Sequence, residues 1–231
     1  DTVGTEASFK DLSGRKKNLL HIATHGFYWT ETEACRLGGL SFLNMADDNA
    51  VRYSEDKALT RSGLLLAGAN NALMGRPLPE GVDDGILTAK EISRLDLRGL
   101  DLVVLSACQT GLGEITGDGV FGLQRGFKKA GANTLLMSLW SVDDDATRLL
   151  MTRFYENYIS GMTKMESLRE AQTYVRDYVI EKTVTVGSGK RPITAMEKEQ
   201  ARKRKPQTVV RKIRPYADPR YWAAFILLDA L

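Results

Sequence analysis

Two residues that can do nucleophilic chemistry each follow a short apolar run. Cys108 follows the run Leu102–Leu105, and His25 follows an apolar run within Asn18–Thr24. Short apolar runs rich in branched side chains are typical of strands buried on both faces of a sheet. In open α/β sheets, reactive groups collect at the carboxyl ends of strands. The two positions therefore predict a cysteine–histidine pair at one edge of a sheet.

A cysteine–histidine pair is suited to acyl transfer. The thiolate is the nucleophile, and an adjacent imidazole lowers the thiol pKa or takes the thiol proton. The reaction also needs hydrogen-bond donors for the oxyanion that develops on the attacked carbonyl. The backbone N–H of Gly26 is the first candidate donor, because no side chain blocks approach to it, and the N–H of Cys108 is the second.

Each of these residues also has a plainer interpretation. A free cysteine is often a small buried apolar residue, and the residues alone leave Cys108 open between packing and catalysis. Its place before the glycine-containing loop Gln109–Gly113 favours catalysis. His21 competes with His25 for the base role, and strand alternation would allow both on one face. Because His21 lies inside the apolar run, we expect it to be a hydrogen-bonded core histidine and assign the base role to His25.

The composition limits the remaining chemistry. Cys35 and Cys108 fit no disulfide framework, which indicates free thiols, a reducing compartment and a cytoplasmic protein, with Cys35 an incidental surface thiol. Together with His21 and His25 they match no zinc-site spacing, and no Walker or dinucleotide motif is present. We therefore expect no metal and no cofactor. Since no apolar run reaches 18 residues, we expect no membrane partner.

The net charge of +3 hides a basic segment near the C-terminus. Residues 188–214 hold ten Lys or Arg against two Glu, a local charge of +8, so the rest of the chain carries about −5 (3 − 8). Such a charge run is most often a solvated loop. Because aromatic residues for base stacking are absent there, we do not expect nucleic acid as a partner.

An acidic cluster, Asp143–Asp145, follows the last interior apolar run. Aspartate at this position predicts a helix N-cap and charges that suit the helix dipole. The alternative is that Asp143 or Asp144 also lines a substrate pocket for a basic side chain.

The pattern of apolar residues, glycines and capping motifs predicts an α/β protein with a mostly parallel central sheet and helices on both faces. Capping boxes at Thr88–Glu91 and Thr163–Glu166 mark two helix starts, and Gly131 marks a helix end. The predicted helices are 6–10, 89–95, 119–130, 143–158 and 163–180. The predicted strands are 18–24, 40–43, 63–66, 102–105, 134–140 and 221–228, with loops at 70–85 and 183–214.

Six ordered blocks resemble the CHAT domain, a caspase-like family found widely in bacteria, often joined to tetratricopeptide repeats and related to separase. The blocks are LHIATHG (20–26), LTAKEI (87–92), LVVLSACQTGLGE (102–114), GVFGLQRGFKKAGANTLLMSLWSVDDDAT (119–147), FYENYISG (154–161) and YWAAFILL (221–228). The resemblance implies a caspase-haemoglobinase-like three-layer sandwich and a thiol protease of clan CD. It gives His25 and Cys108 the catalytic roles and Gly26 the oxyanion role, while His21 matches a histidine outside the dyad.

The resemblance also indicates where this chain departs from the family. Residues 1–231 are expected to form one CHAT domain, as its C-terminal part, with N-terminal elements missing or on another chain. Irregular insertions are expected at about 27–61 and 183–214. Arg148 stands where separase-like enzymes carry the carboxylate that selects arginine, so an arginine preference does not follow.

The sequence thus predicts a cysteine endopeptidase that cleaves a specific protein substrate. We expect regulation by a partner, such as a tetratricopeptide-repeat protein, or by proteolytic processing. The alternative is a catalytically silent caspase-like interaction module. A third interpretation, a cysteine-dependent amidase acting on small molecules, has less support.

Overall fold

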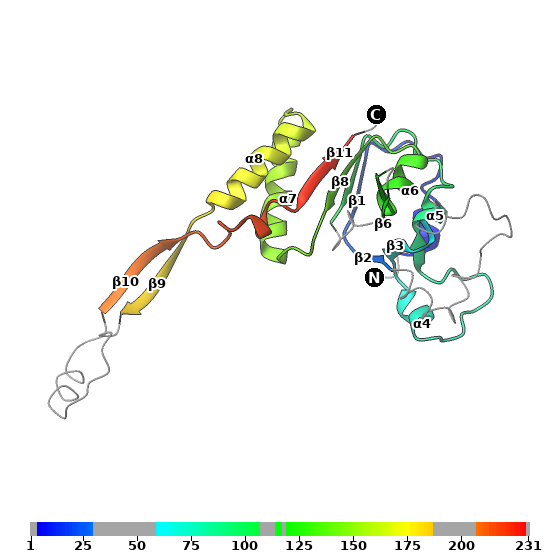
Figure 1. Cartoon of the computed structure of the whole chain (residues 1–231), viewed down its shortest axis with the longest axis horizontal. Helices are drawn as coiled ribbons and strands as arrows, with labels where there is room; N and C mark the ends of the chain where they lie inside the picture. Colours follow the sequence, from blue (N-terminus) through cyan, green and yellow to red (C-terminus); the bar gives the residue numbers. More distant parts are fainter. Residues whose placement is uncertain (1–3, 30–58, 107–113, 117–118, 187–206, 230–231) are drawn as a thin grey trace, which may run out of the picture.

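The computed structural model describes residues 4–29, 59–106, 114–116, 119–186 and 207–229. A four-stranded sheet forms its centre, in the order β1-β5-β8-β11 (Figure 1). The strands are β1 (Leu19–Ile22), β5 (Leu102–Leu105), β8 (Thr134–Ser138) and β11 (Phe225–Leu228). β1, β5 and β8 are parallel, and β11 runs antiparallel to β8. The mostly parallel central sheet expected from the sequence is confirmed.

Helices cover both faces of this sheet. Alternate side chains of β5 enter two separate cores: Val103 and Leu105 on one face, Leu102 and Val104 on the other. The first core includes Phe127, which is fully buried. Around it pack α1 (Glu6–Lys10), α5 (Ala89–Ile92) and α6 (Leu123–Lys129). The second core is closed by α7 (Asp144–Ile159) and α8 (Lys164–Asp177), which lie on the opposite side of the sheet in Figure 1. Strands buried on both faces explain why β5 is apolar throughout.

Smaller sheets surround the centre. A three-stranded antiparallel sheet has the order β2-β3-β4, and two hairpins pair β6 with β7 and β9 with β10. Their bounds are β2 (His25–Tyr28), β3 (Ser62–Leu65), β4 (Ile86–Thr88), β6 (Glu114–Thr116), β7 (Gly119–Phe121), β9 (Ile180–Val186) and β10 (Gln207–Ile213). Two short helices, α4 (Ala69–Leu73) and the 3₁₀ turn η2 (Pro219–Tyr221), complete the described elements. The β9–β10 hairpin projects away from the sheets (Figure 1).

The helix starts predicted from capping residues are confirmed. Thr88 and Thr163 each form a full capping box, and Asp143 caps α7 by accepting a hydrogen bond from the Ala146 N–H at 3.0 Å. Gly131, with φ of 98°, follows the end of α6 as the sequence predicts. These motifs are local, so the sequence alone determines them.

Five expectations about elements need correction. The predicted strand 221–228 begins only at Phe225, after the 3₁₀ turn η2 and a further turn. The predicted strand 18–24 stops at Ile22, and His25 begins a separate strand in another sheet. Residues 119–121 form β7 rather than the first turn of a helix, because they pair with β6. The predicted loop 70–85 contains most of α4, whose Ala69 and Ala72 pack on Ile86. The predicted loop 183–214 contains most of a seven-rung antiparallel hairpin. The expected strand at 40–43 lies outside the described residues.

Candidate active site

The carboxyl ends of β1 and β5 lie level with each other. Ile22 pairs with Leu105, and the Ser106 N–H donates a hydrogen bond to the Ile22 carbonyl at 2.9 Å. His25 comes three residues after Ile22 in the chain, and Cys108 comes three residues after Leu105. Cys108 itself lies outside the described residues, as do Gly111, Gly113 and Cys35. The register of the two strands therefore brings the chain segments leading to the predicted dyad to the same edge of the sheet.

His25 is positioned by the three-stranded sheet. Thr24 Oγ1 donates a hydrogen bond to the Leu65 carbonyl, and His25 lies opposite Leu65 in the β2–β3 pair. The imidazole is exposed, and no described residue hydrogen-bonds to its ring. Antiparallel pairing thus holds the backbone of His25 while its ring remains accessible.

The N–H of Gly26 points away from β3. In antiparallel pairs, hydrogen-bonded and non-hydrogen-bonded pairs alternate. The Trp29 N–H donates to the Arg61 carbonyl at 2.8 Å, so the His25–Leu65 pair, four residues earlier on β2, has the same hydrogen-bonded character. Gly26, opposite Leu64, therefore belongs to a non-hydrogen-bonded pair, and no other described strand pairs with the far side of β2. Its N–H is therefore directed outward, as an oxyanion donor requires.

Gly63 on β3 leaves room for the Phe27 ring of β2 and the Leu87 carbonyl of β4 to lie against the β3 backbone. A Cβ at Gly63 would lie 2.3 Å from the Leu87 carbonyl oxygen and 2.8 Å from the ring of Phe27. Phe27 covers the glycine and stacks on Trp29, with 4.2 Å between ring centroids. This contact fixes β2 two residues beyond His25.

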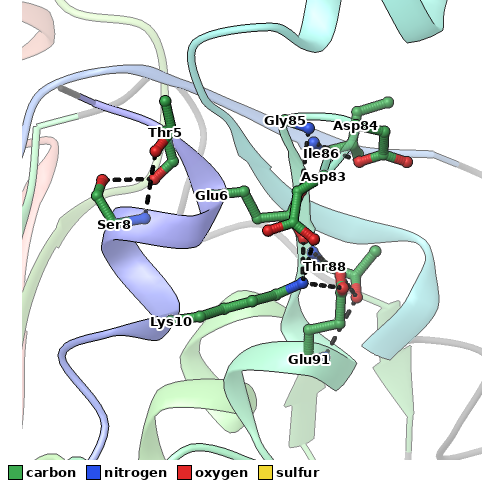
Figure 2. Close-up of polar contacts among 10 residues, drawn as sticks. All are labelled: Thr5, Glu6, Ser8, Lys10, Asp83, Asp84, Gly85, Ile86, Thr88 and Glu91. Carbon is green, nitrogen blue, oxygen red and sulfur yellow. Dashed lines mark hydrogen bonds and ion pairs between the residues drawn. The ribbon is translucent and has the colours of Figure 1, made fainter. Parts of the chain in front are cut away.

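A polar cluster ties helix α1 to the β3–β4 region (Figure 2). Lys10 Nζ lies 2.6 Å from a Glu6 carboxylate oxygen and 3.2 Å from each of Asp83 and Glu91. The other Glu6 oxygen accepts the Gly85 N–H at 2.9 Å. Burial raises the pKa of Glu6 to about 7, and the carboxylates of Glu91 and Asp83 act in the same direction against Lys10. The cluster supports the sheet that carries His25.

The N-terminal residues reinforce the same link. Thr5 forms a parallel bridge with Ala67, and the Ala67 N–H donates to the Gly4 carbonyl at 2.9 Å. Ala67 follows β3 by two residues, so this bridge links the N-terminal segment to the chain just beyond β3.

His21 has a structural role. Its Nδ1 lies 2.9 Å from the Tyr155 hydroxyl of α7, and burial lowers the pKa of the imidazole. The expected hydrogen bond is confirmed, but α7 covers the ring only in part, so the residue stays exposed rather than in the core. No described strand pairs with the outer edge of β1. His21 also does not share a strand with His25. Neither Tyr155 nor Thr24 could be assigned from the sequence, because their partners are 134 and 41 residues away.

Asp143 and Asp144 lie beyond the carboxyl end of β8, which neighbours β5 in the sheet. Asp143 caps α7, as expected, and Asp144 occupies the first turn of the helix. Both residues are exposed. Arg148 lies 3.5 Å from Asp145, within α7. The acidic cluster is therefore near the sheet edge that β1 and β5 share, and its substrate-binding role remains a prediction.

Two further findings concern the described part of the chain. No three His, Cys, Asp or Glu side chains there come together in a group that could hold a metal ion. None of its helices has the length and apolarity needed to cross a membrane.

These features define an α/β protein with an accessible histidine beyond the edge of a parallel sheet. Residues 1–230 match the CHAT domain family, and the chain belongs to that family. It is also similar to tetratricopeptide repeat protein 28 of Mus musculus, at 39% identity over 92 residues, and of Homo sapiens, at 36% over 91 residues. Each alignment covers 39% of this chain and 4% of the relative, so the chain spans only a small part of these proteins.

Proposed function

We propose that this chain is a cysteine endopeptidase that cleaves a specific protein substrate with a His25–Cys108 dyad. The observation that carries the proposal is the level register of β1 and β5, with Ile22 opposite Leu105. Equal chain lengths, three residues each, then lead to the imidazole and the thiol. The proposed architecture is the caspase-haemoglobinase-like three-layer sandwich, which the two cores on opposite faces of the sheet support.

In the proposed reaction, the Cys108 sulfur attacks the peptide carbonyl carbon and forms a tetrahedral oxyanion. The outward N–H of Gly26 and the N–H of Cys108 stabilise that charge. The carbon–nitrogen bond then breaks, and the His25 imidazolium gives its proton to the leaving amine. Water hydrolyses the thioester, which releases the acid and restores the thiol. The thiol loses its proton to a base before the attack, so the attacking species is the thiolate.

Substrate selection is proposed to involve Asp143 and Asp144. Carboxylates in the first turn of α7 would favour a basic side chain before the scissile bond. Since the Asp143 carboxylate already accepts the Ala146 N–H, Asp144 is the freer of the two.

An electrophilic peptide probe, such as an acyloxymethyl ketone, tests the assignment directly. The wild-type chain should be labelled on Cys108, and Cys108→Ala should abolish labelling. His25→Ala should slow labelling by about 100-fold or more, because general acid–base groups contribute on that scale. Cys35→Ala is the matched control, and it should be labelled like wild type.

Labelling that persists in Cys108→Ala would contradict the dyad. Absence of labelling in the folded wild-type chain, in the presence of its completing partner, would support a silent interaction module instead. A peptide-substrate screen against small amides separates the endopeptidase from an amidase.

We also propose that a further segment or a second chain completes the domain along β1. Within the described residues, no strand pairs with the outer edge of β1, and Leu19 is 39% exposed there. Unpaired edges with apolar side chains invite strand addition. A tetratricopeptide-repeat regulator is a proposed partner, since the similar proteins carry that name.

Hydrogen exchange tests this completion. The outward amides of β1 should exchange more slowly when the chain is part of its longer protein or bound to its partner. The amides of β5, already paired on both sides, should not change. Equal exchange of the β1 amides in both states would contradict the proposal.

A further inference from the structure

The β9–β10 hairpin pairs with no other strand in the described part of the chain. It leaves the body of the molecule beyond α8 and extends into solvent (Figure 1). Its described residues include Val209, Val210 and Ile213, which are 40%, 59% and 36% exposed. A two-stranded ribbon with exposed β-branched residues is not stabilised by a core of its own.

The register assigns the described side chains of the hairpin to two faces. Residues directly opposite in an antiparallel pair share a face, and residues two apart along a strand do so as well. One face, here called the cationic face, carries Ile180, Lys182, Val209, Arg211 and Ile213. The other carries Glu181, Thr183, Val210 and Lys212.

The charges of the two faces differ in their pairing. On the second face, Lys212 lies opposite Glu181, with 3.9 Å between their charged atoms. On the cationic face, Lys182 lies directly opposite Arg211, and neither has an ion-pair partner among the described residues. Like charges directly opposite each other destabilise a hairpin. The hairpin therefore carries an unfavourable pair that an external anion would relieve.

The root of the hairpin is held firmly. The ring centroids of Tyr178, before β9, and Tyr216, after β10, are 6.1 Å apart. Those of Tyr178 and Tyr174 of α8 are 6.0 Å apart. Arg214 is 3.7 Å from Asp177 at the end of α8. These contacts orient the hairpin relative to α8, so its faces are presented in a defined direction.

We propose that the cationic face is a docking site for an acidic protein segment in which carboxylates alternate with apolar side chains. The carboxylates would pair with Lys182 and Arg211, and the apolar side chains would cover Ile180, Ile213 and Val209. A nucleic acid fits less well, because aliphatic side chains flank the charges where base stacking needs aromatic rings. This inference is independent of the proposed peptidase activity.

Fluorescence anisotropy with a labelled peptide of alternating valine and glutamate tests the proposal on the full chain. The matched peptide with glutamine in place of glutamate should bind at least about tenfold more weakly, since a carboxylate on a cation is lost. Arg211→Gln should weaken binding of the acidic peptide by about fivefold or more. Lys212→Gln, the neighbouring residue on the opposite face, should change it by less than about twofold.

A charge swap separates docking from misfolding. The double variant Lys182→Glu/Arg211→Glu should lose the acidic peptide and bind the peptide with lysine in place of glutamate. Failure of the acidic peptide to bind wild type, or equal binding to the double variant, would overturn the proposal. Tighter binding of single-stranded DNA than of the acidic peptide would overturn it in favour of nucleic acid. Loss of the free face through self-association, seen by sedimentation, would overturn it in favour of a second copy.

Discussion

At the residue scale, Gly63 is the position where one added carbon has the largest consequence for the candidate site. The Gly63→Ala variant should lose about 1–3 kcal/mol of unfolding free energy, because its Cβ would meet the Leu87 carbonyl and the Phe27 ring. Chemical denaturation measures this change. Labelling by the peptide probe should fall as well, since β2 carries His25.

Gly4→Ala is the matched control for this substitution. A Cβ at Gly4 meets nothing within 4 Å, so its unfolding free energy should stay near the wild-type value. Equal stability of the two variants would show that the Phe27 ring and the Leu87 carbonyl can move away from residue 63 without cost.

The site residues also show what a sequence can and cannot reveal. His25, Gly26 and Cys108 could be predicted as candidate site residues because strand ends and glycines leave a local pattern. Thr24 and Tyr155 were not, because a hydrogen bond to a residue far along the chain has no local signature. The same limit applies to Gly63. Only glycine fits at this position because Leu87 and Phe27 leave no room for a Cβ.

At the scale of elements, the cluster of α1 makes stability depend on pH. The pKa of Glu6 rises from 4.5 to about 7 in the folded chain, chiefly through burial, so the folded state binds a proton that the unfolded state releases. This stabilisation is complete below pH 4.5 and is lost as the pH rises through about 7. The loss should be about 1–3 kcal/mol, measured by urea denaturation across that range.

Glu6→Gln provides the comparison. A neutral amide cannot ionise, so the dependence of unfolding free energy on pH between 5 and 8 should flatten by roughly the same amount. Lys10 would keep Asp83 and Glu91 as partners in this variant. An unchanged slope would mean that Glu6 is ionised throughout.

Elements differ in how well their sequences predict them. Capping boxes predicted α5 and α8, because a threonine and a glutamate three residues apart satisfy the helix start locally. β4 and the β9–β10 hairpin were missed, because short or polar strands are stabilised by partners that the local pattern does not contain. The predicted helix 119–130 begins too early, because Val120 pairs with Ile115 and belongs to β7.

At the scale of the whole molecule, the hairpin contributes little to the packed body. Replacing residues 180–213 with a short glycine–serine linker should leave the melting temperature within about 2 °C of wild type, because the two cores on the central sheet contain none of these residues. Differential scanning calorimetry measures the effect. A drop of about 8 °C or more would mean that the hairpin supports the fold.

The fold class could be predicted because β5 and the interior of β8 are apolar and alternate with capped helices. The sequence did not predict that β1 belongs to the central sheet while His25 belongs to the separate β2-β3-β4 sheet. This separation depends on the break at residues 23–24, where the chain leaves one sheet and enters another. That break determines the direction in which His25 is presented.

The contact between Trp140 and η2 makes this tryptophan an intrinsic fluorescent reporter. The indole N–H donates to the Arg220 carbonyl at 2.9 Å, just beyond β8, and the neighbouring Tyr221 packs 5.3 Å from Tyr216 at the hairpin root. Trp140 thus lies between the root of the β9–β10 hairpin and the sheet edge of the candidate active site. With Trp29 and Trp222 changed to phenylalanine, the emission wavelength and intensity of Trp140 would report binding at the hairpin or at the candidate active site without any attached dye.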